Sequence, residues 1–157
     1  MDDVTIARAL HVLAVVHWIG GVAMVTLVIL PALARLDLRA GILDLFEAVE
    51  GRFATQARWS VTLVGLTGFW MTWRLDAWDR FAEPGYWWMH AMVIVWAWFT
   101  LVLFVAEPLF LHAWFRRRAA RDPAGTAALA LRAHRVLLVL LVVTVVGAVL
   151  GAHGMLY

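Results

Sequence analysis

The sequence predicts an all-α integral membrane protein, a single domain over residues 1–157 built as a bundle of four transmembrane helices. Of its 157 residues, 64% are hydrophobic and 15% are charged, and the mean hydropathy is +0.84. Soluble domains are closer to half apolar. The apolar residues gather in uncharged runs, and most of the arginines lie between these runs. Most of the surface must therefore face lipid.

Four uncharged runs are long enough, alone or slightly extended, to cross a bilayer as a helix, which takes about 20 residues. They cover residues 9–34, 59–73, 84–106 and 136–157. With their flanks, they predict transmembrane spans at about 5–34, 57–75, 86–113 and 132–154. The first run follows an acidic start and is too long for a cleaved signal peptide, so it should remain as a helix.

Between the first two spans, residues 41–56 alternate apolar and acidic positions at helical spacing. This pattern predicts an amphipathic helix lying in the membrane interface and leading into the second span.

The distribution of arginine predicts the direction of the chain. The loops after spans one and three, with the approach to span four, carry ten arginines, and the opposite side carries Arg8, Arg74 and Arg80. Because basic loops stay in the cytoplasm, we expect both termini on the periplasmic side of a bacterial inner membrane.

Residue types that are missing exclude several classes of chemistry. The sequence has no cysteine, so it forms no disulfide and offers no thiolate ligand or nucleophile. All 13 basic residues are arginine, which excludes a Schiff-base lysine and a Walker-type phosphate loop. The net charge is only +2, and the arginines flank apolar runs, so membrane orientation explains them better than a nucleic-acid partner.

Histidines are the main candidates for a functional site, because ionisable groups inside membrane spans are functional hypotheses by default. Four of the six fall in the periplasmic half of the predicted bundle: His11, His17, His90 and His153. His11, His90 and His153 could each instead be an interfacial residue that bonds lipid headgroups, a role that fits His17 less well because Val16 and Trp18 flank it. Neutral imidazole is a good ligand for haem iron and copper, so the four predict a metal or haem site.

A b-type haem also needs an apolar slot and cations for its propionates. Arg8 lies three residues before His11, and Arg74 lies at the periplasmic end of span two, so both are candidates for that role. His11 and His17 are six residues apart, or about 240° around a helix, so they cannot reach one iron from the same face. We therefore expect a ligand pair made of one of them with His90 or His153.

Two other interpretations remain open. Four methionines fall toward the same half of the bundle, namely Met71, Met89, Met92 and Met155. Thioether and imidazole ligands together suit monovalent copper, so a copper-handling protein is the alternative. A small accessory subunit without a cofactor is the third.

Short motifs resemble two membrane families. The segment from His11 through Trp18 to Gly21, continuing to Pro31, resembles the first helix of the CopD and HemJ families. Arg52-Phe53 with Thr67-Gly68 resembles the second CopD-type helix, and Trp88-Met89-His90 resembles the third HemJ-type helix. The resemblance covers three spans and is loose in the fourth.

HemJ-type proteins are b-haem membrane proteins that oxidise protoporphyrinogen, and CopD-type proteins are linked to copper uptake. The HemJ resemblance implies haem ligation by His11 and His90. Together with the histidine pattern, it predicts redox chemistry or electron transfer near the periplasmic side. We expect the lipid bilayer as environment, quinone or a periplasmic redox protein as partner, and a surface compatible with a homodimer.

Overall fold

The computed structural model describes residues 2–35 and 40–156, with side chains described for residues 2–32 and 51–156. These residues are helical almost throughout and contain no strand. The α-helices are α1 (Asp2–Met24), α2 (Leu30–Arg35), α3 (Ala40–Arg74), α4 (Trp87–Leu101), α5 (His112–Arg121) and α6 (Pro123–Ala152). The π-helical segments η1 (Val25–Ile29) and η4 (Val102–Leu111) connect α1 to α2 and α4 to α5. The short 3-10 turns η2 (Asp79–Ala82) and η3 (Pro84–Tyr86) join α3 to α4.

Within the described residues, three helical stretches are long and apolar enough to cross a membrane: Asp2–Ala32, Pro84–Arg121 and Pro123–Ala152. Their most apolar windows have mean hydropathies of 2.3, 2.1 and 2.6. This confirms an all-helical chain with apolar helices of membrane-spanning length.

The helix α3 is as long as these three but less apolar, and it differs from our prediction in one respect. The expected interfacial segment 41–56 and the expected span 57–75 form one uninterrupted helix, Ala40–Arg74. No proline separates the two segments, so nothing in the local sequence ends the first helix before the second begins.

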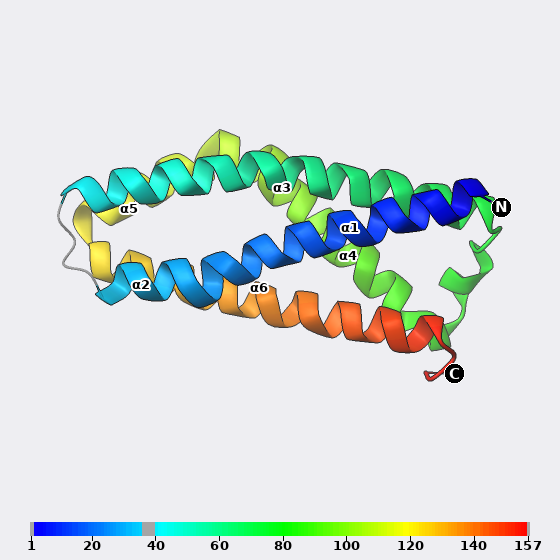
Figure 1. Cartoon of the computed structure of the whole chain (residues 1–157). Coiled ribbons are helices and arrows are strands. Elements are labelled where there is room, and N and C mark those ends of the chain that lie inside the picture. The colour runs from blue at the N-terminus through cyan, green and yellow to red at the C-terminus, as the bar shows by residue number, and fades with distance from the viewer. Residues whose placement is uncertain (1, 36–39, 157) are drawn as a thin grey trace.

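The helices pack lengthwise, and each has two main neighbours. The α1 helix packs against α3 and α6, and α4 packs against the same two helices, so α1 and α4 are diagonal partners. Both termini lie at one end of the molecule, and the hairpin between α5 and α6 lies at the other (Figure 1). The hairpin turns at Asp122, whose carboxylate accepts a hydrogen bond from the Gly125 amide, and Pro123 opens α6.

Side chains from all four directions fill the centre of this arrangement. Trp18 of α1 meets Phe99 of α4 edge-on, with 4.7 Å between the ring centroids. Val61 of α3 and Leu141 of α6 are 0% and 2% exposed beside them. The diagonal helices are therefore bridged by aromatic rings at mid-length.

Glycines let aromatic rings lie directly on neighbouring helices. Gly151 of α6 receives the Trp88 indole, and a Cβ atom at this position would overlap the ring. Because Trp88 is itself buried, the ring has little room to move. By contrast, Gly20 of α1 has no neighbouring atom within 4 Å of the position that a Cβ would take.

Replacing Gly151 with alanine should therefore destabilise the protein by about 1–3 kcal/mol, because the core would be overpacked. The matched substitution Gly20→Ala should be neutral or slightly stabilising, because alanine favours the helix and meets nothing. Thermal unfolding in detergent measures both. Equal effects of the two substitutions would show that the Trp88 contact does not constrain the fold.

Candidate functional site

Two histidines of α1 are held by two hydroxyl groups of α3. His11 Nδ1 lies 2.9 Å from Thr67 Oγ1, and His17 Nδ1 lies 2.8 Å from Ser60 Oγ. Ser60 and Thr67 are seven residues apart, or two helical turns, so they share one face of α3. The histidines, six residues apart, reach that face from the two sides of α1.

The hydrogen bonds of Thr67 determine the tautomer of His11. The Thr67 hydroxyl donates its only hydrogen to the Leu63 carbonyl, 2.6 Å away, so toward His11 its oxygen must accept. In the neutral ring, His11 Nδ1 therefore carries the proton and donates it, and Nε2 keeps its lone pair. A ring fixed in this way by its Nδ1–H is the usual arrangement of a histidine that ligates a metal through Nε2.

Gly68 follows Thr67 and makes room for the same ring. A Cβ at Gly68 would lie 3.3 Å from Cε1 of His11. The His11 ring therefore lies close against the α3 backbone, and the Thr67-Gly68 pair supplies both the hydrogen bond and the space.

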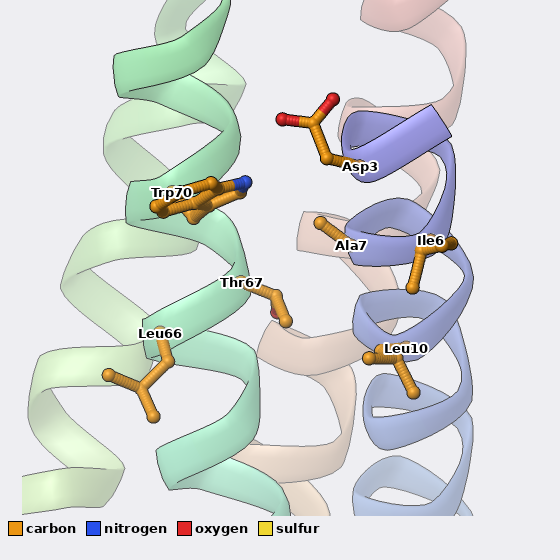
Figure 2. Close-up of a pocket in the computed structure, with 7 residues that line it drawn as sticks. All are labelled: Asp3, Ile6, Ala7, Leu10, Leu66, Thr67 and Trp70. Atoms are coloured by element: carbon orange, nitrogen blue, oxygen red, sulfur yellow. The ribbon is translucent and has the colours of Figure 1, made fainter. Parts of the chain in front are cut away.

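A groove with two adjoining recesses runs along the contact between α1 and α3. The terminal recess, of about 500 Å³, lies toward the N-terminus of α1 and is shown in Figure 2, with Thr67 directed between the helices. Its lining residues are Asp3, Ile6, Ala7, Leu10, Leu66, Thr67 and Trp70. The central recess, of about 520 Å³, is lined by Leu13, Ala14, His17, Trp59, Ser60, Thr62, Leu63 and Leu66. Leu66 lines both recesses, and both are open to the outside of the bundle.

The other two candidate histidines lie elsewhere. His90 is an exposed residue on α4, and its ring packs edge-on against Phe81, with 5.3 Å between centroids. His153 caps the end of α6, is exposed, and has its Nδ1 2.7 Å from the Val149 carbonyl of its own helix. Since α4 is diagonal to α1, His90 does not lie beside His11 or His17 in the described structure.

No group of three or more histidine, aspartate or glutamate side chains suited to a metal ion occurs in the part of the chain that the structure describes. The expected pairing of an α1 histidine with His90 or His153 therefore stays a prediction. Trp18 and Phe99 occupy the centre of the bundle at mid-length, whereas the α1–α3 groove is open.

The two arginines expected to bind propionates differ in their surroundings. Arg74 forms an ion pair with Asp3, with Nε 2.7 Å from Oδ2, and Asp3 lines the terminal recess. Arg8 is exposed on α1. Arg74 could therefore meet an acidic group only by sharing or exchanging its contact with Asp3.

A second polar site lies on the opposite side of α3 and was only partly anticipated. The Arg58 guanidinium forms an ion pair with Glu107, and its Nε donates to the Leu103 carbonyl at 3.0 Å. The expected span 57–75 puts Arg58 at its start, next to the preceding loop. Arg58 lies instead two residues from Ser60, whose partner His17 is midway between Asp2 and Ala32. The structure thus places Arg58 level with the middle of the α1 apolar stretch.

The Arg58 contact supplies a hydrogen-bond donor that the chain lacks. Leu103 lies in η4, a π-helical segment in which each carbonyl accepts from the amide five residues later. For Leu103 that residue is Pro108, which has no N–H. Arg58 Nε takes its place. The Glu107-Pro108 pair in an apolar run was the sequence signal for this site, but the sequence alone did not show which arginine would reach it.

Comparison with known proteins assigns no family. No family model matches the chain, and neither a curated protein nor a solved structure matches it.

Proposed function

We propose that this chain is a membrane protein that binds b-type haem in the α1–α3 groove, through Nε2 of His11, His17 or both, and serves in electron transfer or redox chemistry. The observation that carries the proposal is that two α1 histidines are held through Nδ1 by α3 hydroxyl groups beside the groove, with His17 in the lining of its central recess. The His11 Nδ1–H donates to Thr67, which leaves the Nε2 lone pair for a ligand. The bound haem would supply the one-electron chemistry, and the protein would supply a histidine imidazole and the apolar walls.

The walls of the groove support this class of ligand. Apart from the histidine, serine and threonine side chains and Asp3, its lining is aliphatic or tryptophan, as expected for a cofactor with an apolar body. At the N-terminal end, Arg74 would meet an acidic group of a ligand by sharing its contact with Asp3, with Arg8 as a second cation on α1. The groove faces outward between two helices, so a lipid-soluble partner such as quinone could approach it from the bilayer.

We further propose that α3 crosses the membrane as a fourth span, with both termini on the periplasmic side. The lower hydropathy of α3 is compatible with a membrane span because its polar groups have partners on neighbouring helices. Ser60, Thr67 and Arg58 are satisfied by α1 and η4, so they need no water at that depth. The arginine bias toward the α5–α6 end supports the orientation, which makes the redox site periplasmic in a bacterial inner membrane.

The absorption spectrum of the purified full-length chain, with metal analysis, tests the cofactor. We expect a Soret band and iron in near-stoichiometric amount after expression with sufficient haem supply. Copper without a Soret band would favour a copper-handling protein of the CopD type instead. A protein that contains neither iron nor copper would contradict both assignments and would favour an accessory subunit.

A further inference from the structure

The α5–α6 hairpin, at the end of the molecule opposite the termini, carries a group of arginines. Figure 1 shows α5 and the start of α6 together at that end. Six exposed arginines lie on these two helices, and one of them, Arg116, already has a partner. Asp122 is the single acidic residue between Pro108 and Val136, and its carboxylate caps α6. We refer to the other five as the arginine collar: Arg117, Arg118, Arg121, Arg132 and Arg135.

The collar begins where an exposed apolar surface ends. On the α4–α5 side, Phe110 is 57% exposed, and Arg117 lies seven residues later. Seven residues are about two turns of helix, so Arg117 lies near the same helix face as Phe110 and about 10 Å farther along the axis. On α6, Val136 is 58% exposed and follows Arg132 by four residues, again on one face. Both helices thus change from exposed apolar side chains to exposed arginines.

The two changes occur at one level. The α5 and α6 helices are antiparallel neighbours joined at Asp122, and Phe110 and Val136 are about equally far from that turn. A shared boundary of this kind matches the passage from hydrocarbon to headgroups in a bilayer, whose headgroup layers add roughly 5–7 Å on each side. Arginine stems are long enough to span that layer.

The aromatic residues at this level agree with a membrane surface. Trp114 is 41% exposed, and the Arg118 guanidinium stacks over its ring, with 5.8 Å from Cζ to the centroid. Tryptophan is enriched at the membrane interface. Phe115, one residue further, turns inward and packs on the cluster of Val25, Leu30 and Ala130. The hairpin is therefore anchored to the bundle on one side and presents its arginines on the others.

From this geometry we infer that the arginine collar binds the phosphate groups of anionic phospholipids that surround the α5–α6 hairpin. Guanidinium groups pair well with phosphate oxygens, often through two hydrogen bonds. A collar that follows the helices around an apolar belt suits a ring of lipids. This inference does not depend on haem binding.

The test compares spin-labelled phosphatidylglycerol with spin-labelled phosphatidylcholine bound to the full chain in liposomes, by electron paramagnetic resonance. We expect the wild type to prefer phosphatidylglycerol several-fold at low salt, and less at high salt. In R117Q/R121Q this preference should fall by about twofold or more, because two of the phosphate-binding guanidinium groups are removed. The matched variant R8Q/R80Q removes two arginines near the opposite end and should keep the preference. Circular dichroism checks that both variants are folded.

Three results would overturn the inference. They are a wild type without preference between the two lipids, a preference that R117Q/R121Q retains, and an equal loss in R8Q/R80Q. The first would point to an acidic protein partner, and the last would show that the effect follows net charge alone.

Discussion

Replacing Arg58 with alanine is expected to lower the free energy of unfolding by about 3 kcal/mol, the largest stability effect that we predict. The substitution would leave the Glu107 carboxylate without its ion-pair partner in an apolar region. It would also leave the Leu103 carbonyl without a donor, because Pro108 cannot supply one. Both costs fall on the same π-helical segment of the chain.

Three companion variants separate the two costs. Glu107→Gln keeps the Arg58 contact with Leu103 and removes only the charge of the partner, so it should cost less than Arg58→Ala. The double variant R58M/E107M removes both charges and should recover part of the loss. Arg121→Ala removes an exposed arginine and should change stability by less than about 0.5 kcal/mol. Thermal unfolding in one detergent ranks all four. An Arg58→Ala variant as stable as Arg121→Ala would contradict this role.

The class of fold was predictable because lipid imposes a simple requirement on sequence. Long uncharged runs such as 136–157 have one stable form in a membrane, so the fourth expected span coincides with the apolar part of α6. The course of α3 was less predictable, since an amphipathic segment followed by an apolar one can form one helix or two. Here, packing of Phe53 against Gly21 continues the contact with α1 into the first part of the helix.

The candidate site was predictable in its residue types and only partly in its arrangement. His11 and His17 were identified because histidine is rare in such surroundings. Their partners, Thr67 and Ser60, are ordinary residues of membrane helices. Their spacing of two helical turns is the one sequence feature that relates them. The sequence contains no information on the register between α1 and α3, which pairs His17 with Ser60 and brings Arg58 to mid-depth. Which helices are diagonal is likewise a property of the packing.

Loss of the α1 histidines is expected to have the largest effect on the cofactor. The double variant H11A/H17A removes both imidazoles that line or adjoin the α1–α3 groove. Cysteine and lysine are absent from the chain, so no strong ligand of those types can replace them. We expect haem content to fall at least tenfold. In other metal sites, removing only a residue that hydrogen-bonds a ligand already lowers metal affinity by about that factor. The variants H11A and H17A show which of the two is the ligand.

The haem content of H11A/H17A compared with that of H90A/H153A, both measured by the pyridine haemochrome spectrum of folded purified protein, tests the central claim most directly. If the α1–α3 groove holds the cofactor through α1, H11A/H17A should be nearly free of haem. H90A/H153A should keep haem in an amount close to wild type, because His90 packs on Phe81 and His153 bonds its own helix, both away from the groove. Haem retained by H11A/H17A and lost by H90A/H153A would contradict the account.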